Sequence, residues 1–213
     1  MLPRRCVACG AAAELLCAAC VGSLRTLVAG CARCGAPTAW PVERCSECAG
    51  RRLAFSSARA AIAYDGPARA LVNAWKERGL RRAAGLAAEL VVSRIEAPWV
   101  DVVTAVPPDA ERLLRRGHHP AARLAHELSP RWNLPCAPLL LRTRPSLRQT
   151  GLGLEQRRRN VNGAFAPCGR VPPAVLLVDD VYTTGATVSA ASAALRAGGA
   201  STVDVVTLAR TVR

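Results

Sequence analysis

The chain has 213 residues, of which 51% are hydrophobic, so it can bury a sizeable core and is not a disordered protein. Its formal net charge of +14 predicts attraction to polyanions. No run approaches the roughly 18 apolar residues that span a bilayer, and cysteines stand where a signal peptide has its apolar region. We therefore expect a cytoplasmic protein without a transmembrane segment, in which a reducing environment disfavours disulfides.

Four Cys-x-x-Cys pairs lie within residues 6–48. This spacing lets both thiolates of one turn reach the same metal ion, and two such turns complete a tetrahedral zinc site. A disulfide framework is the alternative, but the even repetition of the pairs favours metal. We expect two structural zinc ions, with pairs that are neighbours in the chain sharing a site. The ligands would be Cys6, Cys9, Cys17, Cys20, Cys31, Cys34, Cys45 and Cys48.

The cysteine-rich segment is short and poor in aromatic residues, so bound zinc would supply part of its folding free energy. We expect it to form a zinc-ribbon module over residues 1–52, followed by a larger domain over residues 53–213. Cys136 and Cys168 stand apart from the pairs. We interpret these two residues as small buried hydrophobic side chains rather than metal ligands.

The larger domain alternates between strand-like and helix-like segments. In chain order we expect a strand over 58–64, helices over 67–77 and 81–96, a strand over 100–106, a helix over 120–128, a short strand near 137–141, a helix over 154–160, a strand over 173–180, a helix over 186–197 and a strand over 202–209. Apolar strands separated by helices predict a parallel sheet covered on both faces. Because ligands bind at the carboxyl ends of such strands, the residues after 106 and 178 are the first candidates for a site.

An acid pair ends the most apolar of these strands. Asp179 and Asp180 follow VLLV, and the next residues, VYTTGAT, lead into the helix expected from residue 186. The N–H groups and hydroxyls of residues 183–187, with the positive end of the helix dipole behind them, predict a phosphate site. Because carboxylates can accept hydrogen bonds from vicinal hydroxyls, the two features together predict a ribose 5-phosphate. The alternative, a strand end with ordinary helix caps, explains only one acid and one threonine.

The stretch VLLVDDVYTTGAT (175–187) resembles the 5-phosphoribosyl-1-pyrophosphate (PRPP) motif of type I phosphoribosyltransferases. AVPPDAERLLRRGHHPAARLA (105–125) and RPSLRQTGLGLEQRRRNVNGAF (144–165) resemble two segments of the ComF subfamily, in which a Cys-x-x-Cys module also precedes the domain. The resemblance covers essentially the whole chain. It implies an α/β fold with a type I phosphoribosyltransferase-like parallel sheet flanked by helices.

The resemblance also implies roles for individual residues. Asp179 and Asp180 would bind the ribose hydroxyls at the catalytic centre, and residues 183–187 would hold the 5-phosphate. Magnesium would bridge pyrophosphate and ribose oxygens, since this cation prefers oxygen ligands. Residues 142–159 would form a flexible hood over the ligand. The expected ligand contacts are Val181, Tyr182, Thr183, Thr184, Gly185, Ala186 and Thr187 after the acids, Ala105, Val106, Pro107 and Pro108 in a pyrophosphate loop, and Lys76, Arg112, Arg115 and Arg116 as cationic groups.

Two features leave alternatives open. Lys76 is the only lysine among 29 basic residues, which favours a role at the pyrophosphate, with an unpaired solvated side chain as an equal alternative. His118 and His119 stand where the family often has an aromatic residue followed by Asn or Asp. We interpret them as loop residues, with metal binding or acid–base catalysis as the alternative.

Three functions are compatible with this pattern. ComF-type proteins are associated with natural competence, which implies DNA uptake together with single-stranded DNA and a helicase. An active phosphoribosyltransferase that releases pyrophosphate from PRPP is a second function, and a PRPP-sensing regulator without catalysis is a third. Aromatic residues make up only 4% of the chain, which argues against a stacking platform for bases. A homodimer is one assembly that the chain could form.

Overall fold

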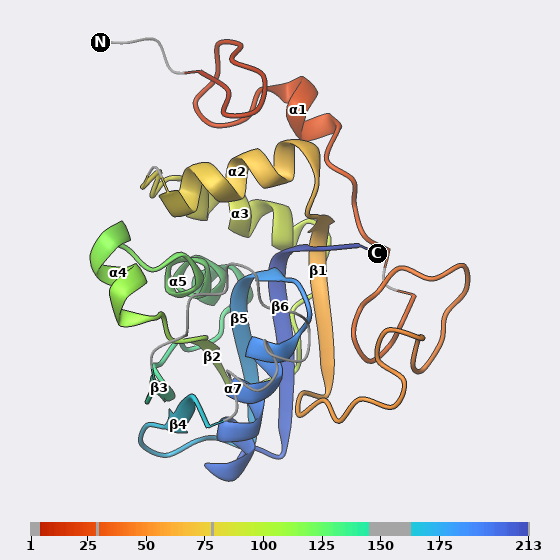
Figure 1. Ribbon diagram of the computed structural model, residues 1–213, viewed down its shortest axis with the longest axis vertical. Coiled ribbons are helices and arrows are strands. Elements are labelled where there is room, and N and C mark those ends of the chain that lie inside the picture. Colours follow the sequence, from red (N-terminus) through yellow and green to blue (C-terminus); the bar gives the residue numbers. More distant parts are fainter. Residues whose placement is uncertain (1–4, 29, 78, 145–162, 213) are drawn as a thin grey trace.

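A parallel sheet forms the centre of the molecule (Figure 1). The computed structural model describes residues 5–28, 30–77, 79–144 and 163–212. Four strands run parallel in the order β1–β6–β5–β2, and a separate antiparallel pair, β3–β4, lies near the β2 edge. Their bounds are β1 Ser57–Ala63, β2 Val102–Ala105, β3 Leu140–Arg142, β4 Phe165–Pro167, β5 Ala174–Tyr182 and β6 Thr202–Arg210. The expected parallel sheet is confirmed.

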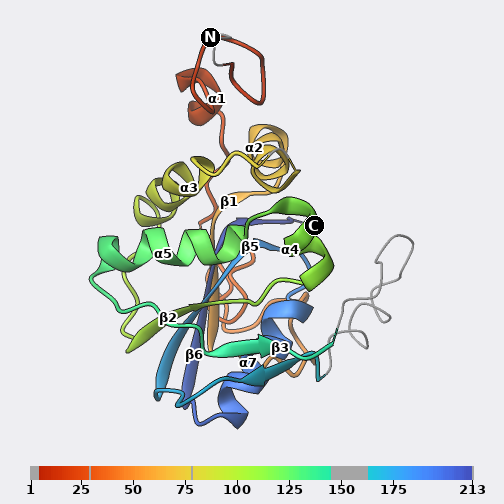
Figure 2. The ribbon, with the colours of Figure 1, turned by 90° about the vertical axis from the view of Figure 1, so that its left-hand side faces the viewer.

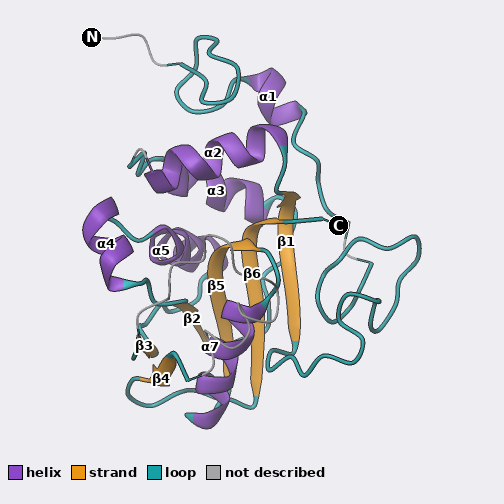
Figure 3. Cartoon of the chain, viewed as in Figure 1, coloured by secondary structure: helices purple, strands orange, loops and turns teal. Residues whose placement is uncertain are grey.

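Helices cover both faces of this sheet (Figure 3). Helices α2, α3 and α5 lie on one face and α7 lies on the other; in Figure 2, α2 and α3 are above the strands and α5 crosses in front of their upper ends. The helices are α1 Ala18–Gly22, α2 Gly66–Glu77, α3 Ala83–Val92, α4 Ala110–Arg116, α5 Pro120–Trp132 and α7 Ala186–Ala197. In the part of the chain that the structure describes, every helix is too short or too polar to cross a membrane.

The alternation of side chains along β5 creates two separate cores. Val175 and Leu177 point to the face covered by α7, whereas Leu176 and Val178 point to the face covered by α2, α3 and α5. All four side chains have no exposed surface. Because both faces of the sheet are covered, β5 contains a continuous run of apolar residues, and this run made the strand easy to predict from the sequence.

The two cysteine segments join different cores. Cys31, Cys34, Cys45 and Cys48 are buried together with Phe55 in the core on the α7 side, next to β1. The first segment packs Val7, Leu15 and Leu16 against the opposite core, above α2. The boundary between residues 52 and 53 stays a prediction.

Most expected elements match the structure, two helices differ from it in length, and α1, α4 and β4 were not expected. The helix expected over 81–96 is shorter, because the chain turns after Val92. The helix expected over 120–128 continues to Trp132 through Pro130. Helix α4 was missed because it buries none of its side chains and so has no apolar periodicity; it is set by the cap of Asp109 and by Gly117, which has a positive φ of 65°. The helix expected over 154–160 lies outside the described residues.

Candidate functional site

A cavity of about 270 Å³ opens at the carboxyl ends of β2 and β5. These are the two strand ends from which a ligand site was expected. The cavity is lined by Tyr64, Lys76, Val106, Pro107, Pro108, Asp109, Arg112, Arg116, His118, His119, Pro120, Ala121, Arg142, Asp179, Asp180, Val181, Thr183 and Thr187. Side chains more than 100 residues apart in the sequence therefore share one site.

An ion pair and a backbone hydrogen bond hold the two acids in place. Lys76 Nζ is 2.6 Å from Asp180 Oδ1, and the backbone N–H of Asp180 donates a hydrogen bond of 2.9 Å to Asp179 Oδ1. Burial, together with the negative charge of Asp180, raises the pKa of Asp179 to about 7. Burial alone would lower the pKa of Lys76, but the carboxylates of Asp180 and Asp179 outweigh it and raise that pKa. The lysine is therefore paired, and the solvated alternative is wrong.

The loop after the acids begins helix α7. Gly185 is the N-cap with a φ of 73°, and a Cβ at this position would come within 2.2 Å of Tyr182 Oη. Only glycine combines this backbone conformation with this close approach. Thr183 is exposed and Thr187 half-buried, and both line the cavity beside the first N–H groups of the helix.

Four residues expected to contact the ligand have other positions. Tyr182, Thr184, Gly185 and Ala186 form the support of the loop and do not line the cavity as the structure describes it. Thr184 Oγ1 accepts a hydrogen bond from the Ala186 N–H, at 3.3 Å. Their side chains serve the shape of the loop, and their backbone N–H groups remain candidates for phosphate contact.

Cationic side chains also line the cavity. Arg112 and Arg116 line it from α4, and Arg116 also pairs with Glu77 at 2.6 Å. Arg142 lies over the ring of Phe165, 4.6 Å from its centroid, and burial lowers the pKa of this guanidinium. Arg115 is away from the cavity and pairs with Glu77 at 3.5 Å.

The loop after β2 contributes its backbone and two prolines to the lining of the cavity. Val106, Pro107 and Pro108 line the cavity, whereas Ala105 lines a neighbouring one. His119 Nε2 lies 2.9 Å from the carbonyl oxygen of Val106. Both ring nitrogens of His118 likewise face backbone carbonyls, at 2.9 and 2.8 Å. This geometry supports the interpretation of the two histidines as residues that hold the loops.

Sequence reasoning missed several residues of the cavity. Tyr64 directly follows β1, and ligands bind where the strands of a parallel sheet end, so its position in the sequence is a signal that could have identified it. Asp109, Pro120 and Ala121 carry no local signal of ligand binding. Arg142 belongs to the expected hood, of which residues 145–159 lie outside the described residues.

Eight of the ten cysteines form two groups of four, and within each group the sulfur atoms lie within 4.8 Å of one another. In the second group, Cys31–Cys48, Cys34–Cys45 and Cys45–Cys48 are separated by 3.6, 3.5 and 3.9 Å between sulfurs. A tetrahedron with zinc–sulfur bonds of about 2.3 Å has edges of about 3.8 Å, so the group fits zinc. A disulfide needs about 2.05 Å. The grouping is sequential along the chain, as expected.

The surroundings of Cys31 favour its thiolate. Burial alone would raise the pKa of Cys31, but hydrogen bonds from the N–H groups of Cys34 and Cys45 outweigh it and lower the pKa to about 6. A thiolate is the form that binds metal. Cys136 and Cys168 are half-buried and belong to neither group.

Comparison with known proteins gives three relatives that each match nearly the whole chain. The chain is 30% identical to DNA utilization protein YhgH of Salmonella typhi over 211 residues, which are 92% of this chain and 91% of that protein. It is 31% identical to the protein of the same name in Escherichia coli O157:H7, over the same shares. It is 28% identical to Competence protein F of Haemophilus influenzae, over 92% of this chain and 90% of that protein. No family model matches the chain.

Proposed function

The chain belongs to the ComF family, that of Competence protein F and DNA utilization protein YhgH, and on that premise we propose that its cavity binds PRPP or a related phosphoribosyl ligand. We further propose that the protein acts in the use of incoming DNA, with single-stranded DNA or a DNA-uptake helicase as partner. The names of its relatives and the net charge of +14 support the second part.

One observation carries the ligand proposal: a single cavity brings the acid pair together with two kinds of anion-binding group. Asp179 and Asp180 line it together with residues of the loop 183–187 and with three arginines, which are Arg112, Arg116 and Arg142. A ligand that carries vicinal hydroxyls between two phosphate groups can use this whole set. A simple phosphate or a nucleobase alone would use only part of it.

Different residues of the cavity would bind different parts of the ligand. The N–H groups at the start of α7, with Thr183 and Thr187, would hold the 5-phosphate. Asp179 would accept hydrogen bonds from the ribose hydroxyls, while Lys76 balances the charge of Asp180. Carboxylate oxygens are ligands of the kind that magnesium prefers, so the acid pair fits a magnesium ion that also binds the pyrophosphate. Bound there, magnesium would neutralise part of the charge on the pyrophosphate.

A neighbouring apolar cavity favours phosphoribosyl transfer as a second candidate function. It has a volume of about 220 Å³ and shares Pro107, Pro108 and His119 with the charged cavity. An acceptor with a flat apolar ring would fit the lining of this second cavity. Release of pyrophosphate from PRPP in a screen of nucleobases and amines would establish this reaction.

Thermal unfolding in the presence of matched ligands tests the proposal. PRPP with magnesium should raise the melting temperature, ribose 5-phosphate should raise it less, and glucose 6-phosphate should leave it unchanged. Binding of a labelled single-stranded oligonucleotide, measured from 50 to 200 mM salt, tests the DNA part and should weaken steeply with salt. Equal stabilisation by all three phosphates would refute a phosphoribosyl site, and no oligonucleotide binding at low salt would refute direct contact with DNA.

A further inference from the structure

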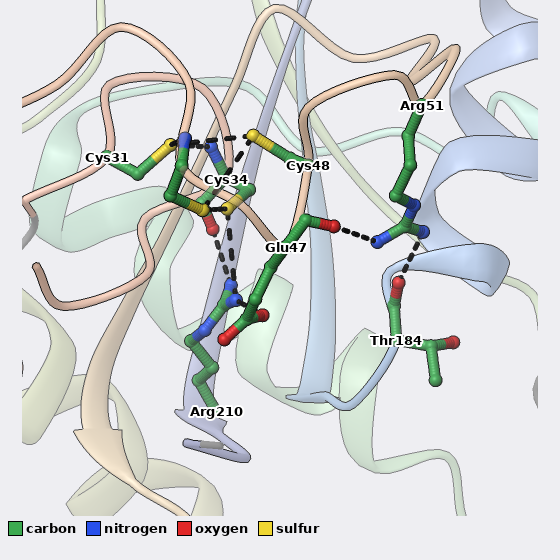
Figure 4. A network of polar contacts seen from close by, with 8 residues as sticks. Cys31, Cys34, Glu47, Cys48, Arg51, Thr184 and Arg210 are labelled. Carbon is green, nitrogen blue, oxygen red and sulfur yellow. Dashed lines mark hydrogen bonds and ion pairs between the residues drawn. The ribbon is translucent and has the colours of Figure 1, made fainter.

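The second cysteine cluster, which consists of Cys31, Cys34, Cys45 and Cys48, is tied to the last residue of β6. Arg210 has an exposed fraction of only 1% and donates hydrogen bonds to the Cys34 carbonyl oxygen at 2.6 Å and to Glu47 Oε2 at 2.7 Å (Figure 4). Glu47 lies between Cys45 and Cys48 in the chain, so its position follows from that of the cluster. A buried guanidinium held this way fixes the cluster to the sheet.

Arg210 also continues the connection towards the cavity. Its guanidinium carbon lies 4.5 Å from the centroid of the Tyr182 ring. Tyr182 is buried, and a Cβ on Gly185 would come within 2.2 Å of its hydroxyl oxygen. The Tyr182 side chain therefore packs against the turn of residues 183–187 and supports it.

Arg51 makes a second, independent connection. It donates one hydrogen bond to the Glu47 carbonyl oxygen at 3.4 Å and another to the Thr184 carbonyl oxygen at 2.6 Å (Figure 4). Thr184 lies in the middle of the loop, 133 residues further along the chain. The same glutamate thus holds both arginines, one through its side chain and one through its backbone.

We infer that the second cysteine cluster positions the loop 183–187, with Arg51 and Arg210 as the positioning residues. The inference rests on the proposed function only for the identity of the ligand. The sulfur geometry of the cluster fits zinc, so a bound metal would keep Glu47 in place. The first cluster packs Val7, Leu15 and Leu16 against the other core, above α2. The two clusters therefore contact different parts of the molecule, and among the described residues the hydrogen bond from Arg51 to Thr184 connects the second cluster to the loop.

The test variant is Arg51→Ala, because Arg51 is half-buried and its loss leaves the core intact. Loss of Arg210 would instead leave the buried Cys34 carbonyl and the Glu47 carboxylate without their partner. Arg59→Ala is the matched control: Arg59 is also half-buried and also donates to the cysteine segment, at the Ala32 carbonyl oxygen, but does not reach the loop. Arg51→Lys keeps a donor and should restore part of the effect. Metal analysis should find unchanged zinc content in all three variants.

Hydrogen exchange of the ligand-free protein gives a readout that does not depend on ligand. Arg51→Ala should speed exchange in peptides covering 182–188 by about fivefold or more, since a hydrogen bond to a charged group is lost. Arg59→Ala should leave these peptides unchanged. Unchanged exchange in Arg51→Ala, or an equal rise in Arg59→Ala, would overturn the inference.

Ligand binding separates the inference from the proposed function. Arg51→Ala should weaken ribose 5-phosphate by about tenfold. Its effect on magnesium pyrophosphate, which Arg112, Arg116 and Arg142 would hold, should stay within about twofold. General destabilisation would weaken both probes alike and contradict positioning. If the unmodified protein binds neither probe while Arg51→Ala alone loosens the loop, the proposed function fails and the positioning role stands.

Discussion

Replacing Asp179 by asparagine should stabilise the ligand-free protein at pH 8 while removing its ability to bind a ribose. The carboxyl group lies beside Asp180 in a partly buried position, and burial with that neighbouring charge raises its pKa from 3.8 to about 7. Asparagine has nearly the same shape and can still accept the hydrogen bond from the Asp180 N–H. The substitution therefore removes a charge that the folded state tolerates poorly and keeps the local structure.

The size of the effect follows from the pKa. Because the folded protein holds its proton up to a higher pH than the unfolded chain, the aspartate lowers stability progressively as pH rises from about 4 to about 7. Each pKa unit corresponds to about 1.4 kcal/mol, so the shift from 3.8 to about 7 sets an upper limit of about 4.5 kcal/mol. Because the residue is partly exposed and solvent screens its charge, the gain at pH 8 is on the order of 2–4 kcal/mol. At pH 4 the carboxyl group is protonated in the folded protein and the gain should be below about 1 kcal/mol.

Urea denaturation of both proteins at pH 4 and pH 8 measures this difference directly. Asp65→Asn is the matched control, because Asp65 is a surface carboxylate paired with Arg25, and its loss should cost less than about 1 kcal/mol at either pH. A gain for Asp179→Asn that is equal at pH 4 and pH 8 would show that packing rather than charge is responsible. No gain at pH 8 would refute the account of the acid pair.

Three further predictions concern Lys76, Gly185 and the first cysteine cluster. Lys76→Met leaves Asp180 without its 2.6 Å partner, so it should cost about 1–3 kcal/mol at pH 8 and weaken PRPP, with Lys76→Arg less affected; equal stability of Lys76→Met and the unmodified protein would contradict the pairing. Gly185→Ala combines an unfavourable φ with a clash against Tyr182 and should lower the urea midpoint more than Gly169→Ala, which has a φ of 72° and open space; the reverse order would refute the contact. Cys9→Ser should reduce zinc from two ions per chain to one and leave PRPP binding intact, as measured by metal analysis and calorimetry, and loss of both ions would show that the clusters are not independent.

The sequence predicted the parts of the molecule that have a local signal. Strand β5 is buried on both faces and begins with a continuous apolar run, and the two acids near its carboxyl end lie at the edge where parallel sheets bind ligands. The cysteine spacing likewise predicted two sequential clusters. In each case the structural feature determines the residue types over a short stretch of sequence, so the sequence alone predicts it.

The rest depends on contacts between distant segments. Nothing near Arg51 in the chain indicates that it bonds Thr184, and nothing near Lys76 indicates that Asp180 is its partner. The second cysteine cluster was expected to belong to a separate module, whereas its side chains share a core with the sheet. Helix α4 has no buried face, so its existence depends on its caps rather than on periodicity.

Calorimetric titration of PRPP with magnesium tests the central claim most directly. The unmodified protein should bind PRPP saturably, and the double variant Asp179→Asn with Asp180→Asn should show no binding while keeping its zinc and its fold. Unchanged affinity in the double variant, or no binding by the unmodified protein, would contradict the assignment of the acid pair to the ribose.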